Sequence, residues 1–264
     1  MDTARPCHED LVVDSCEALG AELFLLRLIL PGPDEAAAFQ AGQFAQLAVP
    51  GHALPRPFSI LRSRNGKLEL LVKQVGSGTA WLAGRRAGDR VATLWPLGHG
   101  FRHRLAEDGR TLPWLLVGGG VGIAPLIALQ EQESRRERLR LLFGYRDRAT
   151  AEASARLHPG LEVLLATEDG SLGFPGRVTE LLSHVLEEGP ARLFCCGPAA
   201  MMEAVAALAR ERDLPCLLSL ETLMGCGIGI CVGCAVPRPD GGYALACQTG
   251  PVFPSTELVP GGLA

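Results

Sequence analysis

The sequence predicts a multidomain α+β protein with an antiparallel β-barrel, a doubly wound α/β domain and a small loop-rich module. Short strand-like runs separated by turns fill roughly residues 8–105, and strand-like runs alternating with helix-like runs follow them. The first pattern is typical of a small barrel, the second of a parallel sheet. A cysteine-rich stretch near the end indicates the third unit. We expect the boundaries at 1–106, 107–214 and 215–264.

The expected barrel strands are runs of β-branched and aliphatic residues, with Asn65-Gly66 as a clear hairpin turn. They lie within 11–30 and at 44–49, 58–61, 68–72 and 90–94, with a short helical turn at 80–82.

The second pattern opens with Thr111–Gln130, which carries no charge and is long enough to cross a bilayer. Its central glycines and Pro125 favour a strand, a glycine turn and the start of a helix that runs to about Arg138. Further strands are expected at 139–145, 161–166 and 192–196, and helices at 178–187 and 199–212.

Composition limits the classes of function. The 264 residues are 47% hydrophobic, enough for two domains with sizeable cores and a small module. A net charge of −4 disfavours a nucleic-acid partner, which needs a basic face. Because Met1–Asp10 is polar and lacks an apolar signal core, we expect a cytoplasmic protein without a membrane span.

The cysteine-rich stretch carries the most specific chemical signal. Four residues separate the first two of its cysteines, two separate the next pair, and twelve precede the last. This spacing is that of plant-type [2Fe–2S] proteins. Interleaved glycines permit left-handed backbone and bring amides close to the sulfurs. The expected ligands are Cys226, Cys231, Cys234 and Cys247, and the glycines are Gly225, Gly227, Gly229 and Gly233.

Three other interpretations of these cysteines stay open. A structural zinc site also uses four thiolates, although it usually has two short paired knuckles, whereas Cys247 stands alone. Disulfides fit poorly with an odd total of nine cysteines and no secretion signal. Four unconnected buried thiols would leave the glycines unexplained.

A nicotinamide site is expected where two strands end. The turn Gly118-Gly119-Gly120-Val121-Gly122 follows an apolar strand and opens a helix, where backbone amides favour a pyrophosphate. Cys196-Gly197-Pro198 ends a later strand and should face that turn. Cys196 is a candidate nicotinamide neighbour, and no residue is assigned a catalytic role with certainty. The alternatives are close strand–helix packing for the glycines and a core position for Cys195 and Cys196.

The carboxylates Glu168 and Asp169 end another strand. There they can accept a ribose hydroxyl and repel a 2′-phosphate, which favours NADH over NADPH. An ordinary polar turn explains the same residues equally well. Arg146 and Arg148 follow the neighbouring strand and would bind a phosphate if they turned inward.

Two barrel motifs suit a phosphate-bearing ligand. Arg56-Pro57-Phe58-Ser59 places a forked guanidinium and a hydroxyl at a strand start, and Gly76-Ser77-Gly78-Thr79 offers amides before a helical turn. From these residues alone, a surface arginine and a plain β-turn are the stronger interpretation.

Taken together, these motifs resemble the ferredoxin–NADP⁺ reductase superfamily. In that family the barrel motif binds FAD and the second domain binds the nicotinamide cofactor. With Ser219-Leu220-Glu221 before the cysteines and Gly250-Pro251-Val252-Phe253 after them, the chain resembles the electron-transfer subunits of class 1B dihydroorotate dehydrogenases. The resemblance implies that FAD is held by Arg56, Pro57, Phe58, Ser59, Leu71, Val72, Lys73, Gly78 and Thr79.

The resemblance also implies a function. The chain would be an NAD-linked flavin and iron–sulfur oxidoreductase subunit, exchanging electrons with an FMN-containing catalytic subunit that converts dihydroorotate to orotate with NAD⁺ in pyrimidine biosynthesis. The implied assembly is a heterotetramer with two copies of each subunit. Related modules serve hydrogenases and NADH-dependent ferredoxin:NADP⁺ oxidoreductases. A zinc-stapled binding protein is the alternative without redox activity.

Overall fold

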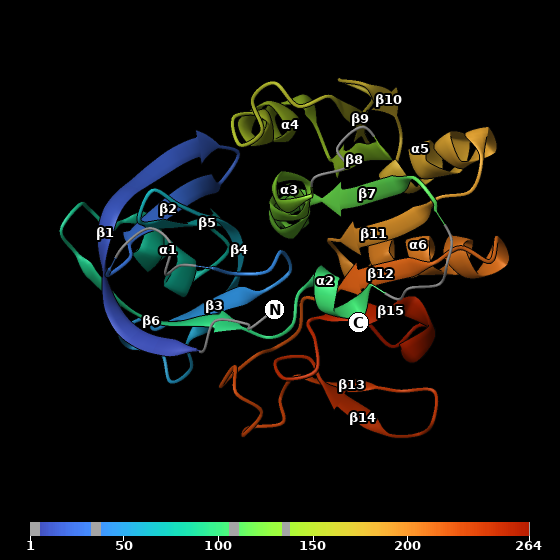
Figure 1. Ribbon diagram of the computed structural model, residues 1–264. Coiled ribbons are helices and arrows are strands. Elements are labelled where there is room, and N and C mark those ends of the chain that lie inside the picture. The colour runs from blue at the N-terminus through green and yellow to red at the C-terminus, as the bar shows by residue number, and fades with distance from the viewer. Residues whose placement is uncertain (1–5, 33–37, 106–110, 134–137, 264) are drawn as a thin grey trace.

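The computed structural model of the chain describes residues 6–32, 38–105, 111–133 and 138–263. Within these residues a closed antiparallel barrel lies beside a 7-stranded sheet flanked by helices, and a 2-stranded sheet lies apart from both. Figure 1 shows the barrel on the left, the large sheet on the right and the small sheet below them. The predicted fold class is confirmed.

The barrel is built from six strands in the order β1-β2-β5-β4-β3-β6. They are β1 (Cys7–Gly20), β2 (Leu23–Ile29), β3 (Phe44–Leu47), β4 (Arg56–Arg64), β5 (Lys67–Lys73) and β6 (Arg90–Leu97). The turn Asn65-Gly66 has positive φ at both residues and joins β4 to β5, as the sequence predicts. Leucine-rich strand faces fill the interior, and helix α1 (Ser77–Ala83) adds Leu82 to it.

The large sheet has the order β10-β9-β8-β7-β11-β12-β15, with every neighbouring pair parallel except β12 and β15. Its strands are β7 (Trp114–Gly119), β8 (Leu139–Tyr145), β9 (Val163–Thr167), β10 (Phe174–Pro175), β11 (Arg192–Cys196), β12 (Cys216–Ser219) and β15 (Val252–Pro254). The central strands are buried on both faces, which explains their continuous apolar runs.

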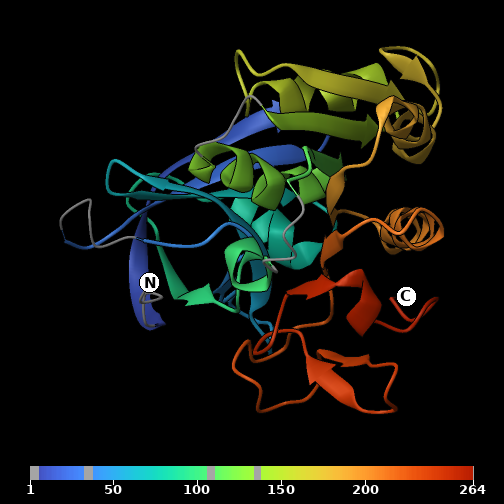
Figure 2. The same cartoon turned by 45° about the vertical axis from the view of Figure 1, so that its right-hand side comes forward.

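Helices cover both faces of this sheet. They are α3 (Ile123–Gln132), α4 (Arg148–Ala155), α5 (Val178–Val185) and α6 (Ala199–Glu211). In Figure 2, α3 lies beside the barrel strands, whereas α5 and α6 lie on the opposite side of the sheet. Packed against β4, helix α3 is the main element between the barrel and the sheet.

Shorter elements complete the chain. They are α2 (Phe101–Arg104), β13 (Ala235–Pro237), β14 (Tyr243–Leu245) and the 3-10 turns η2 (Gly120–Gly122), η4 (Leu186–Glu188) and η5 (Ser255–Glu257). The uncharged stretch that begins at Thr111 contains β7, η2 and most of α3, as predicted. In the described part of the chain, no helix has the length and apolar character needed to cross a membrane.

Two features differ from the sequence prediction. Helix α3 ends at Gln132 rather than near Arg138, because Glu133 adopts an extended backbone (φ −87°, ψ 131°). Residues 134–137 of the expected helix lie outside the described residues. Strands β12 and β15, in the region expected to be loop-rich, extend the large sheet, and Phe253 in β15 is fully buried. Runs of three or four residues are too short to show strand periodicity.

Candidate cofactor sites

The first candidate site is a cavity of about 450 Å³ on the side of the barrel that faces the sheet. Its wall combines apolar side chains with the cations Arg56 and Lys73. It is lined by Phe44, Arg56, Pro57, Phe58, Ser59, Leu71, Lys73, Val75, Thr79, Val121, Leu220, Glu221, Thr222, Met224 and Pro251. An apolar wall with a few positioned polar groups suits an aromatic ring system that carries phosphates.

Arg56 is held in place beside the first turn of α1. Its Nη1 donates to the carbonyl of Leu54 at 2.9 Å, and Nη2 lies 3.0 Å from Nδ1 of His52. A Cβ on Gly78 would lie 3.4 Å from Nε of Arg56, so the first turn of α1 and the guanidinium are in contact range. The two barrel motifs are therefore adjacent in space and present a cation and helical amides together.

Successive side chains of β5 point to opposite faces of the strand, so the predicted flavin residues on it do not all face the cavity. The side chains of Leu71 and Lys73 line the cavity, whereas Val72 points into the barrel core. Thr79 lines the cavity, and its Oγ1 accepts hydrogen bonds from the amides of Val75 and Gly76.

A second cavity of about 400 Å³ lies at the carboxyl ends of the central strands of the large sheet. Lys73 lines both cavities and thus lies between them. The second cavity is lined by Lys73, Gly119, Gly120, Gly144, Tyr145, Arg146, Thr150, Glu168, Arg177, Val178, Thr179, Pro198, Ala200, Met201 and Ala204. This is the expected position for a dinucleotide in an open α/β sheet.

The two predicted strand-end turns meet at the second cavity. A Cβ on Gly122 would lie 2.4 Å from the carbonyl oxygen of Cys196, and one on Gly197 would lie 3.0 Å from the amide of Gly119. Only residues without a Cβ permit this approach. Gly118 is also needed for packing, because a Cβ there would lie 3.0 Å from side-chain atoms of Ile123 and Phe143.

The four predicted cluster ligands form two pairs. Sγ of Cys234 and Sγ of Cys247 are 3.2 Å apart, although thirteen positions separate them in sequence. The amide of Cys231 donates to Sγ of Cys226 at 3.4 Å. Among the described residues, which include all four cysteines, no group of three or more candidate ligands surrounds a single point. Two pairs suit a two-iron cluster, in which each iron takes two thiolates.

Backbone amides point at these sulfurs. Ile228 and Ile230 donate to Sγ of Cys226 at 3.5 and 3.3 Å, and Gly229 donates to Sγ of Cys247 at 3.1 Å. The loop needs left-handed backbone at Gly227 (φ 72°), Gly229 (φ 81°) and also Val232 (φ 58°). The left-handed backbone predicted for the four glycines is thus found at two of them. Val232 is β-branched and adopts a conformation that such residues rarely take.

The amides change the acidity of the thiols. Desolvation acts to raise the pKa of Cys226, but the amides of Cys231, Ile228 and Ile230 outweigh it and lower the pKa to about 6. Burial, followed by the neighbouring Cys234, raises the pKa of Cys247 to about 12. Iron would have to displace that proton, because the thiolate is the ligand. All nine cysteines are free, so none forms a disulfide.

Comparisons with known proteins agree with this geometry. Residues 221–259 match the model of the iron–sulfur cluster binding domain of dihydroorotate dehydrogenase B, and residues 10–101 match an oxidoreductase FAD-binding domain. The dihydroorotate dehydrogenase B (NAD(+)) electron transfer subunit of Desulforamulus reducens is 39% identical over 84% of this chain and 90% of its own. The one from Geobacillus thermodenitrificans is 37% identical over 88% and 91%.

The chain belongs to this family of electron transfer subunits. A solved structure supports the same fold: the NADH-dependent reduced ferredoxin–NADP oxidoreductase aligns with a TM-score of 0.79 at 25% identity, over 97% of this chain and 91% of that one. The two matched domain models account for FAD and an iron–sulfur cluster as cofactors, and the reductase fold accounts for NAD(H).

Several predicted site residues of this family member lie outside both cavities. Asp169 accepts a hydrogen bond from the amide of Ser171 at 3.0 Å in a turn. Its pKa is lowered mainly by the hydroxyl of Ser171 and then by this amide. Cys196 is buried, and desolvation raises its pKa well above the ordinary value. Arg148 donates to the carbonyl of Ser171 and pairs with Glu152 at 3.5 Å, away from the second cavity.

Sequence reasoning missed two charged residues at the cavities, Arg177 and Glu221. Arg177, at the start of α5, lines the second cavity together with Glu168 and with Arg146, which the sequence suggested only as a competing phosphate ligand. Glu221 lines the first cavity, where desolvation raises the pKa of its carboxyl. The position of Arg177 before a helix was a usable signal, whereas Glu221 lies in a loop without periodicity.

Proposed function

We propose that this chain passes electrons between NAD(H) and an FMN-containing catalytic subunit that converts dihydroorotate to orotate. One observation carries the proposal: the flavin cavity borders the nicotinamide turn at Val121 and the cluster loop at Met224, two residues before Cys226. Cofactors bound at these three places would therefore lie in the order that such electron transfer requires. We assign FAD to 1–106, the nicotinamide to 107–214 and the cluster to 215–264.

The residues of the chain supply position and charge. Arg56 and the first turn of α1 would hold the flavin phosphates, and Gly119, Gly120 and Pro198 would admit the nicotinamide. Bound FAD supplies the conversion between the two-electron chemistry of NADH and the single-electron chemistry of the cluster. Gln46 donates to the carbonyl of Met224 at 2.8 Å and so holds the cluster loop against the barrel.

Exposed apolar side chains mark the face toward the partner. They surround the cluster loop and comprise Leu54, Leu223, Ile228, Ile230 and Val232, with exposed fractions of 45–87%. Such a patch on a protein surface is typical of an interaction site. We infer that the catalytic subunit covers it, in a cytoplasmic heterotetramer with two copies of each subunit.

We propose NADH rather than NADPH as the preferred nucleotide. Glu168 lines the cavity and would repel a 2′-phosphate, whereas Arg146 and Arg177 on the same wall act in the opposite direction. We expect a higher kcat/KM for NADH with an artificial acceptor, and Glu168→Gln should reduce this preference. Equal values for both nucleotides in the unmodified protein would contradict the assignment.

The decisive experiment is Cys231→Ser. A serine oxygen is a poorer ligand for iron than a thiolate, so iron content should fall. FAD should remain bound and NADH should still bleach it in a single turnover, but NADH-dependent reduction of orotate by the reconstituted complex should disappear. Cys7→Ser is the matched control, because Cys7 lies in β1, where its thiol donates to the carbonyl of Trp95. Unchanged iron content and orotate reduction in Cys231→Ser would refute the cluster assignment.

A second candidate function follows from the alignment with the NADH-dependent reduced ferredoxin–NADP oxidoreductase. The same module would then serve a ferredoxin-linked or hydrogenase partner. Identifying the protein that co-purifies with the native chain distinguishes the two, because only the first candidate predicts a dihydroorotate-oxidising flavoprotein.

A further inference from the structure

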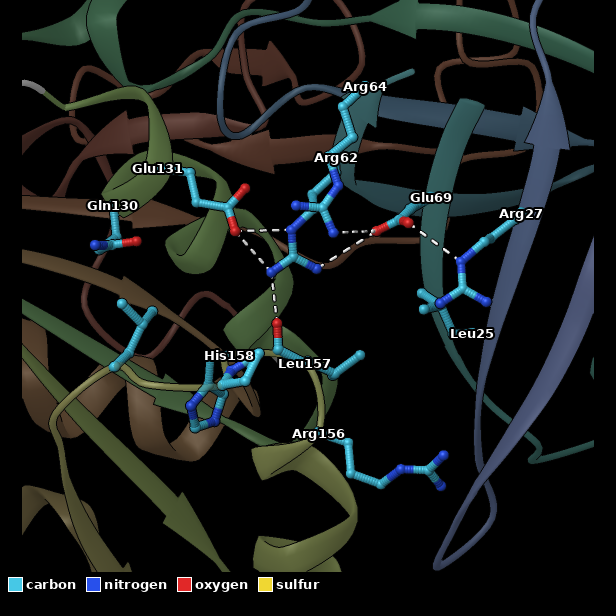
Figure 3. A pocket seen from close by; sticks show the side chains of 12 residues that line it. Leu25, Arg27, Arg62, Arg64, Glu69, Gln130, Glu131, Arg156, Leu157 and His158 are labelled. Atoms are coloured by element: carbon cyan, nitrogen blue, oxygen red, sulfur yellow. Dashed lines mark hydrogen bonds and ion pairs between the residues drawn. The ribbon is translucent and has the colours of Figure 1, made fainter. Parts of the chain in front are cut away.

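A third cavity, of about 530 Å³, lies between the barrel and the large sheet and shares no lining residue with the two cofactor cavities. Charged side chains from both sides line it, as Figure 3 shows. Arg62 lies at its centre, and only 6% of this residue is exposed. A buried guanidinium needs partners for its donors, so the positions of those partners are informative.

Arg62 connects the barrel to the sheet domain. Its Nε donates to Oε1 of Glu131 in α3 at 2.7 Å, and Nη2 donates to the carbonyl of Leu157, which follows α4. On the barrel side, Nη1 lies 3.4 Å from Oε2 of Glu69. Dashed lines in Figure 3 join Arg62 to all three. One planar side chain thus fixes two segments of the sheet domain to the barrel.

The connected elements are those that carry the cofactor sites. Strand β4 begins with Arg56, Pro57, Phe58 and Ser59 at the flavin cavity and reaches Arg62 three residues later. Helix α3 begins directly after the glycine turn and reaches Glu131 at its other end. The Arg62–Glu131 contact therefore joins the far end of the flavin strand to the far end of the nicotinamide helix.

We propose that Arg62, through Glu131, is a positioning residue that sets the distance and angle between flavin and nicotinamide. The ten residues of α3 span about 15 Å, so a rotation of about 4° at Glu131 would move the glycine turn at the other end by about 1 Å. A displacement of about 1 Å between reacting groups can cost about a hundredfold in rate. This inference rests on the proposed transfer from NADH to FAD.

Arg64 provides a matched comparison. It lies two residues further along β4 and lines the same cavity, but its side chain is 57% exposed, and its Nη2 lies 3.9 Å from Oε2 of Glu69 in the barrel. Arg62→Gln and Arg64→Gln remove the same charge from the same strand. The first removes the contacts of Arg62 with Glu131 and Leu157, and the second leaves them in place.

The test measures flavin reduction in a single turnover of the purified, FAD-loaded protein with NADH. We expect Arg62→Gln and Glu131→Gln each to lower the limiting rate about tenfold to a hundredfold. The Kd for NADH, the FAD content and the iron content should stay unchanged, and the long-wavelength absorbance of nicotinamide stacked on flavin should weaken. Arg64→Gln should behave like the unmodified protein. The double variant should be no worse than the poorer single variant, because both act through one contact.

Three results would overturn the inference. One is a normal limiting rate in a folded Glu131→Gln protein, which remains informative even if Arg62→Gln fails to fold. Another is a loss of rate that merely follows loss of FAD or of NADH affinity, because that indicates a structural role. The third is equal effects of the Arg62 and Arg64 substitutions. If NADH does not reduce the flavin of the unmodified protein, the proposed function fails as well.

Discussion

Arg56 shows how a single residue can be oriented for the phosphate that we propose it binds. Its contacts with Leu54 and His52 orient the guanidinium before any phosphate arrives. An oriented side chain loses less conformational entropy on binding than a free one. The sequence motif alone did not distinguish this arrangement from an ordinary surface arginine, because the distinction depends on the adjacent turn of α1.

We expect Arg56→Ala to weaken FAD retention. Loss of a charged hydrogen bond to phosphate costs about 1.5–3 kcal/mol, which is roughly tenfold to over a hundredfold in affinity. Flavin content after extensive dialysis measures the effect. Arg90→Ala is the control, since Arg90 is an exposed barrel arginine outside the flavin cavity. Full flavin retention in Arg56→Ala would show that Arg56 is not a phosphate ligand.

Buried His158 makes stability depend on pH. Desolvation lowers its pKa, and the nearby charge of Arg62 lowers it further. The unfolded chain therefore takes up a proton at higher pH than the folded protein does. Stability is lost as the pH falls below the unfolded pKa of about 6.5 and toward the lower folded pKa.

The corresponding variant is His158→Gln. Its Tm should fall less than that of the unmodified protein between about pH 7 and about pH 5, because glutamine does not titrate. His184→Gln is the control, since that side chain is 62% exposed. Parallel Tm profiles for His158→Gln and the unmodified protein would rule out this contribution.

At the scale of elements, the glycine turn before α3 shows why two strand ends can form one site. Gly122 touches the backbone of Cys196 and Gly197, so the turn after β7 and the turn after β11 are in direct contact. Backbone atoms cannot move aside as the end of a flexible side chain can. The shape of the second cavity thus depends on the absence of a Cβ at Gly122 as well as on the residues that line it.

We expect Gly122→Ala to disrupt this contact. The added Cβ would overlap the Cys196 carbonyl, and overpacking of this kind typically costs about 1–3 kcal/mol. NADH affinity and Tm should both fall, while FAD content should remain. Gly84→Ala is the control, because a Cβ there would lie at an ordinary 3.5 Å from the carbonyl of Trp81. Equal NADH affinities in the two variants would contradict the expectation.

At the scale of the whole molecule, the exposed apolar patch around the cluster loop continues from the barrel into the terminal module. Leu54 belongs to the barrel region, whereas Leu223 and Ile230 belong to the cluster region. The patch therefore exists only because the cluster loop packs on the barrel, where Gln46 holds it.

We expect Leu223→Glu to weaken association with the catalytic subunit. Leu223 is 87% exposed, and loss of its burial in a complex removes about 1.5–3 kcal/mol, or roughly tenfold to a hundredfold in affinity. Titration of the purified partner measures the Kd. Ile29→Glu, which alters an exposed apolar residue of β2 outside the patch, should leave the Kd unchanged. An unaltered Kd for Leu223→Glu would place the partner on another face.

The sequence by itself determined the features that depend on local spacing. The spacing of the proposed cluster cysteines, the Asn65-Gly66 hairpin, the glycine turn and the alternation of strands and helices before residue 215 all follow from periodicity and from the backbone conformations that particular residues allow. Each involves neighbours along the chain, so a pattern of residue types suffices to predict it.

The tertiary structure decided the contacts between distant segments. It paired Cys234 with Cys247, joined β12 and β15 to the sheet, and brought Arg62 to Glu131, 69 residues away. It also turned Val72 and Asp169 away from the cavities while placing Arg177 and Glu221 in them. Such contacts depend on how buried surfaces fit together, which no short pattern of residue types records.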